Sequence, residues 1–406
     1  MFRVTAHRVA IVGIGEDGLK GLSSSALALL AGAGVIFGGR RQLDLAAPVL
    51  RGELRPWPRP IEAALPEILA RRAEGVAVLA SGDPFCFGIG SLLARAIPPE
   101  EMLCLPAPSA FSLAAARLGW ALQEVAVISF CGRPLAPLAP LLQPSARILA
   151  LSADAATPAQ VAEFLCARGF GPSTLILLEA LGGARERIRR FQAAAFDAAD
   201  IAPLNMLALD VEAGPGARIL PLAAGLAEDF FEHDGQISKR EIRALTLSAL
   251  APRQGELLWD IGAGSGAVGI EWMLRHRAMR AIAIEMRADR ARRVAANAIR
   301  LGVPELAVKI GTAPEALADL PPPDAVFVGG GGHDPAVLEG AWNALRPGGR
   351  MVVNAVTLET EATLLSAWRR FGGELHRFSL ERAEPLGGFH SFRPALTVTQ
   401  WHVEKS

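Results

Sequence analysis

The chain has 406 residues, of which 51% are hydrophobic and 20% charged, and its 41 basic and 41 acidic residues cancel. This composition excludes intrinsic disorder and predicts compact domains, two by length, while zero net charge argues against nucleic acid and anionic membranes as partners. The four cysteines lie far apart without a C-x-x-C motif, which argues against a metal or iron–sulfur site and, with no secretory signal before the first strand, favours a reduced cytoplasmic setting.

The basic residues are almost all arginines, since only four are lysines: Lys20, Lys239, Lys309 and Lys405. A bias in the coding genome explains this pattern. A ligand rich in carboxylates explains it as well, because Arg grips carboxylates with two parallel hydrogen bonds. Both interpretations stay open.

The first half of the chain alternates short apolar runs with Ala- and Leu-rich segments, which predicts an α/β architecture. An uncharged stretch between Lys20 and Arg40 is long enough to test as a membrane span. Its glycines and serines instead predict a helix from Ser23 that ends near Gly32. Strands are predicted at 8–13, 35–38, 76–81, 102–107, 125–130, 147–152, 174–180 and 205–212, and a basic helix after residue 188.

A break rich in Gly and Pro at 212–223 predicts a boundary, with a first domain at 1–213, a linker at 214–224 and a second domain at 225–406. Ser238 is expected to cap a helix from Lys239 together with Glu241. Five strand–helix units follow, and two strands near 374–380 and 395–402 close the chain. This order predicts a doubly wound sheet with an antiparallel edge.

A glycine-rich loop follows the strand that ends in Asp260. Read from Gly264 it is G-x-G-x-x-G, a dinucleotide pattern, but that frame starts late for a tight strand-to-helix turn. Read from Gly262 it is G-x-G-x-G and starts directly after the strand. Glu285 ends the next strand, where an acid suits the ribose of any adenosine ligand. A nicotinamide cofactor and a turn without a ligand remain the alternatives.

Asp260 with its G-x-G-x-G loop resembles the class I S-adenosylmethionine methyltransferases, whose seven-stranded Rossmann-like sheet the predicted strand order also matches. The resemblance implies that the methyl donor contacts Asp260, Gly262, Ala263, Gly264, Gly266 and Glu285. An RNA or protein methyltransferase of this fold is a rival hypothesis. The zero net charge and the absence of an N-P-P-Y motif after strand 325–328 weigh against it.

Three loops of the first half follow strands in the same way: the VGIGEDG turn with Gly13 and Gly15, the SGDP segment (Ser81, Gly82, Asp83, Pro84), and the turn at Pro108 and Ser109. Ligands gather at such strand ends, and a buried Asp83 would need a partner or a function, although a plain turn is the alternative. Together these loops resemble the tetrapyrrole methylases (class III methyltransferases), although the first turn departs from that family at 16–18. The resemblance implies two α/β subdomains with S-adenosylmethionine between them.

The two halves together resemble the fused, decarboxylating methyltransferases of the cobalamin pathway. This implies two S-adenosylmethionine sites per chain and a carboxylate-rich corrin precursor that is methylated at carbons 5 and 15 and loses one ring C acetate carboxyl. The second half would serve carbon 15 and the decarboxylation, the first half carbon 5, unless the first half only holds substrate. By the same resemblance Gln236 and Ser238 close over the methyl donor, Ala313 flanks its adenine, and the protein is a homo-oligomer, a tetramer or a dimer.

Candidate substrate residues are arginines near predicted loop ends (Arg40, Arg41, Arg133 and Arg393), each also interpretable as an exposed charge. Gly330 and Gly331, in the loop VGGGGHDP, leave room for a flat ligand. His333, Asn354 and His390 are candidates for proton transfer or positioning. No metal is expected, since the conjugated macrocycle can itself accept the electron pair of the decarboxylation.

Overall fold

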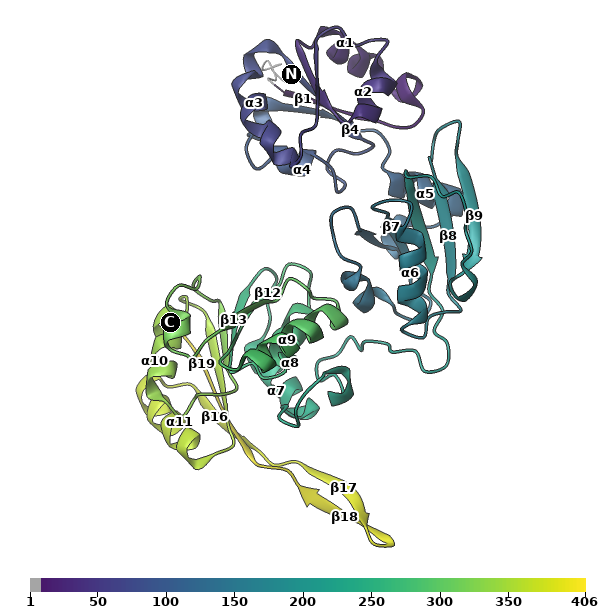
Figure 1. Ribbon diagram of the computed structural model, residues 1–406. Helices are drawn as coiled ribbons and strands as arrows, with labels where there is room; N and C mark the ends of the chain where they lie inside the picture. The colour runs from purple at the N-terminus through teal and green to yellow at the C-terminus, as the bar shows by residue number, and fades with distance from the viewer. Residues whose placement is uncertain (1–8) are drawn as a thin grey trace. The chain divides into compact units, whose positions relative to one another are not determined.

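The computed structural model describes residues 9–406, so the first predicted strand starts one residue outside the described part. The chain divides into two compact units. The first runs to Leu135 and resumes over Gln143–Arg218, and the second joins Ala136–Leu142 to Ile219–Ser406. Both alternate strands and helices, as expected (Figure 1). The break at Arg218 lies within the predicted linker 214–224.

The first unit opens with a parallel five-stranded sheet in the order β3-β2-β4-β1-β5. Alternate residues of one strand enter two different cores: Val9 and Ile11 pack with α3 and α4, and Val12 and Ile14 pack with α1 and α2. Burial on both faces explains why β1 and β4 are continuous apolar runs. The elements are β1 (Val9–Ile14), β2 (Val35–Gly38), β3 (Glu53–Pro56), β4 (Val76–Ser81), β5 (Met102–Leu105), α1 (Ser24–Gly32), α2 (Arg40–Ala46), α3 (Leu65–Ala70) and α4 (Gly90–Leu93).

A second five-stranded sheet of the same unit has the order β6-β7-β10-β8-β9, with β10 antiparallel to both of its neighbours. Phe111 of α5 packs on its apolar face. The unit is therefore built from two α/β subdomains, as the tetrapyrrole-methylase resemblance implies. The elements are β6 (Ala126–Ser129), β7 (Arg147–Leu151), β8 (Thr174–Glu179), β9 (Arg187–Gln192), β10 (Asn205–Asp210), α5 (Ala110–Leu118) and α6 (Thr157–Cys166).

The second unit is a seven-stranded sheet in the order β13-β12-β11-β14-β15-β19-β16. Its first five strands are parallel, and β19 runs antiparallel to β15 and β16, which gives the predicted antiparallel edge. The elements are β11 (Leu257–Ile261), β12 (Arg280–Glu285), β13 (Ala307–Ile310), β14 (Ala325–Val328), β15 (Arg350–Ala355), β16 (Glu374–Phe378), β19 (Val398–Glu404), α7 (Arg240–Leu250), α8 (Ala267–Met273), α9 (Ala288–Leu301), α10 (Pro335–Ala344) and α11 (Leu358–Phe371).

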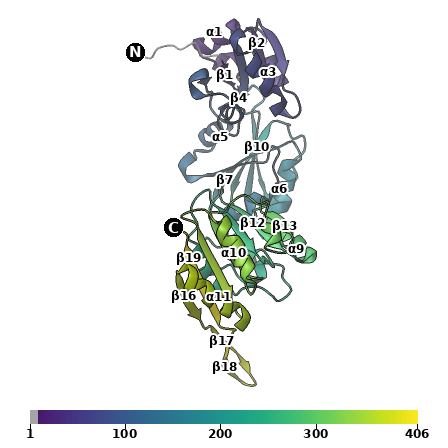
Figure 2. The same cartoon turned by 90° about the vertical axis from the view of Figure 1, so that its left-hand side faces the viewer.

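A two-stranded ribbon leaves this sheet between β16 and β19. It pairs β17 (Glu381–Leu386) with β18 (Phe389–Pro394) around Gly387 and Gly388 and projects beyond the sheet in both views (Figure 1, Figure 2). No strand is predicted between 380 and 395. Two glycines between two runs of strand length are a hairpin signal in their own right.

Two local predictions are wrong. The segment after residue 188 is not a helix, because Arg187–Gln192 forms β9 at the edge of its sheet and pairs with β8. Ser238 does not cap a helix, since α7 starts one residue later with Lys239 at its N-cap and no side-chain hydrogen bond. The helix after Ser23 is confirmed, and Ser23 Oγ accepts from Ala26 N. No helix among residues 9–406 is long and apolar enough to span a membrane.

Candidate functional sites

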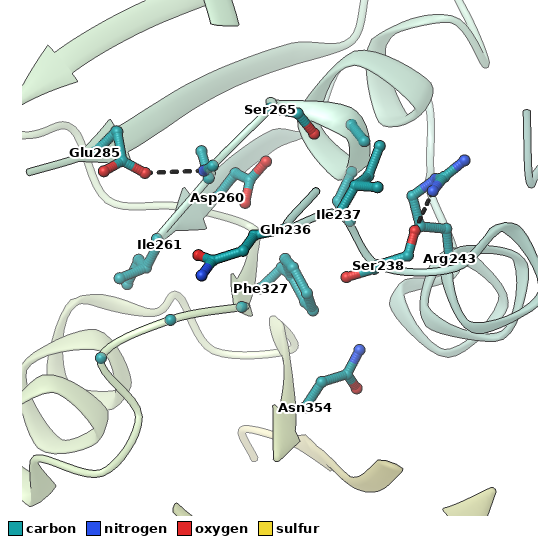
Figure 3. Close-up of a pocket in the computed structure, with 18 of the residues that line it drawn as sticks. Gln236, Ile237, Ser238, Arg243, Asp260, Ile261, Ser265, Glu285, Phe327 and Asn354 are labelled. Carbon is teal, nitrogen blue, oxygen red and sulfur yellow. Dashed lines mark hydrogen bonds between the residues drawn. The ribbon is translucent and has the colours of Figure 1, made fainter. Parts of the chain in front are cut away.

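The second unit holds a cavity of about 840 Å³ at the carboxyl ends of its parallel strands. The glycine loop after β11, Glu285 of β12, the loop after β14 and Asn354 of β15 line it (Figure 3). This is the edge where open α/β sheets bind ligands. Many of the predicted residues lie together here: Gln236, Ser238, Asp260, Gly262, Ala263, Gly264, Glu285, Ala313, Gly330, Gly331 and Asn354.

Gly262 lets two loops that line this cavity touch each other. Its φ is +71°, and a Cβ there would lie 2.6 Å from the backbone of Gly330. A side chain would therefore be strained and would also push the loop after β14 away. Gly266 has no contact with the cavity and acts as the left-handed N-cap of α8, where a Cβ would meet Val294 at 2.7 Å.

Asp260 is fully buried, and only one of its two carboxyl oxygens has a hydrogen-bond partner among the described residues. Oδ2 accepts a 2.9 Å hydrogen bond from Gly269 N, whereas Oδ1 has no partner among the described residues. Burial raises the pKa of Asp260 to about 7, the Gly269 hydrogen bond opposes the rise, and the charge of Glu285 adds to it. An unpaired buried acceptor at the cavity fits a cationic N–H donor on a ligand, such as an amino acid ammonium.

Glu285 links the end of β12 to the glycine loop. Its Oε2 accepts from Gly264 N at 2.9 Å, and its Oε1 accepts from Arg287 N at 3.0 Å. Each carboxylate oxygen keeps acceptor capacity. The buried side chain is therefore fixed in place and can still accept from a pair of hydroxyl groups.

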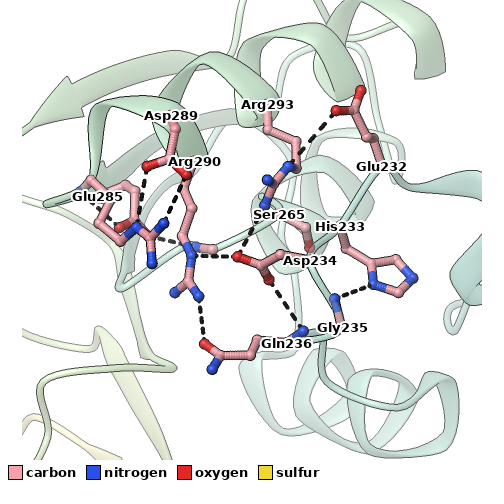
Figure 4. A network of polar contacts seen from close by, with 12 residues as sticks. Glu232, His233, Asp234, Gly235, Gln236, Ser265, Glu285, Asp289, Arg290 and Arg293 are labelled. Atoms are coloured by element: carbon pink, nitrogen blue, oxygen red, sulfur yellow. Dashed lines mark hydrogen bonds and ion pairs between the residues drawn. The ribbon is translucent and has the colours of Figure 1, made fainter.

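A strap over residues 225–239 closes one side of the cavity. Asp234 pairs with Arg290 at 2.9 Å and with Arg293 at 3.3 Å, both on α9 (Figure 4). Desolvation opposes ionisation of Asp234, but hydrogen bonds from Gln236 N, Arg290 and Arg293 outweigh it and lower its pKa to about 2. Arg290 also donates to the Gln236 side chain, which lines the cavity. The strap is thus fastened to α9 by charge.

Arg243 fastens the strap from the other side. Its side chain is unexposed, pairs with the equally unexposed Glu271 at 2.8 Å, and donates to the carbonyls of Leu226 and Ser238. Glu271 in turn accepts from Gly225 N at 2.6 Å and Leu226 N at 3.1 Å. Arg243 and Arg290 are not predictable from the sequence, because their roles depend on contacts between distant segments.

Three further candidates of this unit lie outside the cavity. His333 is exposed in the loop before α10, and His390 is exposed on β18 of the ribbon. Arg393, also on β18, lies 3.4 Å from Glu384 of the opposite strand. Neither histidine nor Arg393 belongs to the cavity lining, so the structure brings none of them to Asn354.

The first unit holds a smaller cavity of about 370 Å³, and it gathers most of the predicted loops: Gly15, Ser81, Gly82, Asp83, Pro108 and Ser109 line it. Gly13 stands just behind, where a Cβ would lie 2.0 Å from Gly82 O. Pro84 O accepts from Gly90 N. Asp83 is half-buried rather than buried as expected, and its Oδ1 accepts from Phe85 N at 2.8 Å.

Neighbouring arginines of the first unit occupy different positions. Arg41 lines the cavity, forms an ion pair with Glu16 and donates to Ser81 Oγ at 3.0 Å. Arg40 is exposed and does not line the cavity. Arg133 lies with its guanidinium 5.2 Å from the ring centre of Phe87, a residue that does line it.

Two buried polar atoms in this cavity have no partner among the described residues: Ser152 Oγ and Asn205 Oδ1. Leu151 pairs with Met206 across β7 and β10, so the next register position sets Ser152 opposite Asn205. Orphaned polar atoms at a cavity indicate a ligand that completes them. Only the strand register brings these two residues together, so local sequence does not reveal them.

Both halves match known families. Residues 8–197 match the family described as Tetrapyrrole (Corrin/Porphyrin) Methylases, and residues 229–405 match the one described as a Precorrin methyltransferase domain. The chain is 55% identical over 397 residues to a precorrin-6Y C(5,15)-methyltransferase [decarboxylating] of Sinorhizobium sp, covering 98% of this chain and 96% of that protein. It is 42% identical to the Mycobacterium tuberculosis (strain CDC 1551 / Oshkosh) protein of that name, covering 98% of this chain and all of the relative.

Shorter relatives match part of the chain. The cobalt-precorrin-6B C(15)-methyltransferase (decarboxylating) of Salmonella typhimurium is 33% identical over 162 residues, which cover 39% of this chain and 83% of that protein. A crystal structure of the C-terminal domain of precorrin-6Y C5,15-methyltransferase from Rhodobacter capsulatus is 49% identical, with a TM-score of 0.44, and covers 46% of this chain and 100% of that one.

Proposed function

The chain belongs to the family of precorrin-6Y C(5,15)-methyltransferases (decarboxylating), S-adenosylmethionine-dependent enzymes of cobalamin biosynthesis, and we propose that each of its two units binds its own methyl donor. The reaction is methylation of precorrin-6B at carbons 5 and 15 with loss of the ring C acetate carboxyl, giving precorrin-8. The observation that carries the proposal is that each unit has a separate cavity built from its own strand-end loops.

The residues of the larger cavity fit S-adenosylmethionine. The unpaired Oδ1 of Asp260 suits the ammonium of its methionine part, and Glu285 suits its ribose hydroxyls. When bound, the sulfonium supplies the methyl group. The loop with Gly330 would help to position that group and exclude water, which is the main requirement for transfer to a carbon that is already electron-rich.

In the smaller cavity, the loops at Gly15, Ser81 and Pro108 would hold the second methyl donor. Arg41 is the substrate residue that we favour, since it combines a position in the cavity lining with a full positive charge. In the structure the guanidinium of Arg41 forms an ion pair with Glu16. An incoming substrate carboxylate would then replace Glu16.

We assign carbon 15 methylation and decarboxylation to the second unit and carbon 5 methylation to the first. The Salmonella relative supports placing carbon 15 methylation and decarboxylation in one unit. Its 162 aligned residues make up 83% of its length, so it is no larger than one domain, and its name includes both activities. We further propose a boundary at 214–224 and a homo-oligomer, a tetramer or a dimer.

Incubation of the full chain with S-adenosylmethionine and precorrin-6B, followed by mass spectrometry, tests the proposal. The expected product has gained two methyl groups and lost one carbon dioxide. Calorimetry with S-adenosylhomocysteine should find two equivalents bound per chain. A single equivalent would favour the alternative in which the first unit only holds substrate.

A further inference from the structure

Asn354 presents a side chain amide to the larger cavity and is held there by two other polar side chains. It sits near the end of β15, half-buried, and lines the cavity together with Phe327 (Figure 3). Its Nδ2 donates to Thr246 Oγ1 at 2.9 Å, and its Oδ1 accepts from Gln400 Nε2 at 2.9 Å. Thr246 belongs to α7 and Gln400 to β19, so three distant segments meet at this amide.

The hydrogen bonds around Asn354 determine which side of its amide carries the nitrogen and which the oxygen. The Thr246 hydroxyl gives its only hydrogen to Ile242 O at 2.8 Å, so towards Asn354 it can only accept. A reversed amide would set its carbonyl against that oxygen and its N–H groups against the Gln400 N–H groups. Asn354 therefore keeps its Nδ2 on Thr246, and the second Nδ2 hydrogen has no acceptor among the described residues.

The two side chains that hold this amide are almost fully buried. Thr246 has 0% and Gln400 2% of its surface exposed. Burying a hydroxyl and an amide is costly unless both are hydrogen-bonded, and apolar residues of similar shape would pack here without that cost. The arrangement is best explained by a need for one oriented N–H donor at the cavity.

The position in the sheet places this donor on the substrate side. Asp260 and Glu285, which suit the methyl donor, lie at the carboxyl ends of β11 and β12, whereas Asn354 lies near the carboxyl end of β15, two strands beyond β11 on the other side. Strands lie about 4.8 Å apart, so β15 is roughly 10 Å from β11. A flat substrate beside the loop after β14 would reach Asn354 with a substituent.

Beyond Thr246 and Gln400, the cavity wall on this face of the sheet is apolar. It pairs with Gln400, so the next positions on the same face are Val356 and Val398, and both line the cavity. Leu396, 74% exposed, extends this apolar wall. Both lining arginines are in ion pairs, Arg243 with Glu271 and Arg290 with Asp234, and Lys239 lies on the strap.

We propose that Asn354 binds the acetate carboxylate that the enzyme removes, by donating its second Nδ2 hydrogen to it. A neutral donor in an apolar wall orients a carboxylate without the strong stabilisation that a cation would give it. The bond from the methylene to the carboxylate carbon breaks, its electron pair enters the conjugated macrocycle, and carbon dioxide leaves. The methylene carbon then takes up one proton from water and becomes a methyl group, so no oxidant is needed.

Thr246 and Gln400 are positioning residues in this scheme, since they act through Asn354. The inference rests on the proposed function, in which the second unit carries out the decarboxylation. The test is the ratio of carbon dioxide released to methyl groups transferred by the full chain, measured with precorrin-6B and S-adenosylmethionine. A purely structural defect lowers both quantities together and leaves the ratio unchanged.

Asn354→Asp keeps the shape and removes the donor, and Gln400→Met keeps the length and frees the amide. We expect Asn354→Asp to slow carbon dioxide release at least about tenfold, the loss of a hydrogen bond to a charged group, with carbon 15 methylation reduced less than about threefold. Gln400→Met should lower the same ratio by a smaller factor. An affinity for S-adenosylhomocysteine equal to that of the wild type would show that both variants are folded.

Asn343→Asp is the matched control, because Asn343 is exposed on α10 and does not line the cavity. It should leave the ratio at the wild-type value. If Asn354→Asp releases carbon dioxide at the wild-type rate, or if both activities fall in parallel, the assignment of Asn354 is wrong while the proposed function stands. If the wild-type chain methylates precorrin-6B without releasing carbon dioxide, both the assignment of Asn354 and the proposed function are wrong.

Discussion

Arg243 and Glu271 form an ion pair in which neither side chain is exposed, with 2.8 Å between Nε and Oε1. The pair joins α7 to α8 and, through the backbone of Gly225 and Leu226, holds the start of the strap. One buried contact therefore supports both the fold of the second unit and the wall of its cavity.

Glu271→Gln should destabilise the second unit by about 3–5 kcal/mol, because it leaves the Arg243 charge buried without a counter-charge. The new amide nitrogen would also face the backbone N–H groups that now donate to this side chain. Denaturant unfolding measures the effect. Asp289→Asn, which breaks an ion pair with Arg287 whose side chains are 45% and 54% exposed, should cost no more than about 1 kcal/mol.

Gly262→Ala should abolish binding at one of the two proposed methyl-donor sites. The added Cβ would lie 2.6 Å from the Gly330 backbone at a φ of +71°, so the loops at the cavity must separate. Titration with S-adenosylhomocysteine should then give one equivalent instead of two. Gly388→Ala, where a Cβ meets nothing within 4 Å, should keep both. Two equivalents in Gly262→Ala would show that this loop is not a site.

Binding at the same site should strengthen as the pH rises through neutrality. Asp260 has a pKa of about 7 in the folded protein, and only its ionised form attracts an ammonium. The affinity for S-adenosylhomocysteine should therefore rise about tenfold between pH 6 and pH 8, as the ionised fraction grows, and Asp260→Asn should remove this dependence. Calorimetry at several pH values measures it, and an equal slope in the variant contradicts the assignment.

The raised pKa has the opposite consequence for the ligand-free fold. The folded state holds the Asp260 proton more tightly than the unfolded chain, where the pKa is about 4. This contribution to stability is complete below about pH 4 and is lost as the pH rises to about 7. Unfolding of Asp260→Asn across that range should show a correspondingly smaller decline.

Arg41→Gln should reduce carbon 5 methylation by at least about tenfold, through a higher KM for the substrate, because it removes the cation that lines the smaller cavity. Arg40→Gln changes the adjacent exposed residue and should have little effect. Product masses from the full chain separate loss of one methyl group from loss of both. Equal effects of the two variants would point to a diffuse surface charge.

Regular, local patterns made most of the fold predictable. The eight strands predicted in the first half are found as β1, β2, β4, β5, β6, β7, β8 and β10, because each is a short, largely apolar run. β9 was not predicted, because RIRRFQ has no alternating pattern of its own. Arg187 and Arg189 of β9 both pair with the buried Glu179 of β8, a contact that local sequence cannot show.

The site residues also differ in whether local sequence is enough to predict them. Asp260 and the glycine loop follow one strand directly, so spacing is enough to find them. Arg290, Ser152 and Asn205 reach their cavities through packing and strand register. His333 and His390 are predicted from residue type and from the loops that carry them, and the structure shows both exposed and outside the cavity lining.

The part of the strap over residues 232–236 contains no apolar side chain and is exposed throughout. Its attachments are polar: Asp234 to Arg290 and Arg293, and the Glu232 backbone to Asn297. Lifting it breaks charged contacts but uncovers almost no hydrophobic surface. We therefore expect added salt to weaken the attachment of residues 232–236 to α9, and we expect their release to carry only a small heat-capacity change.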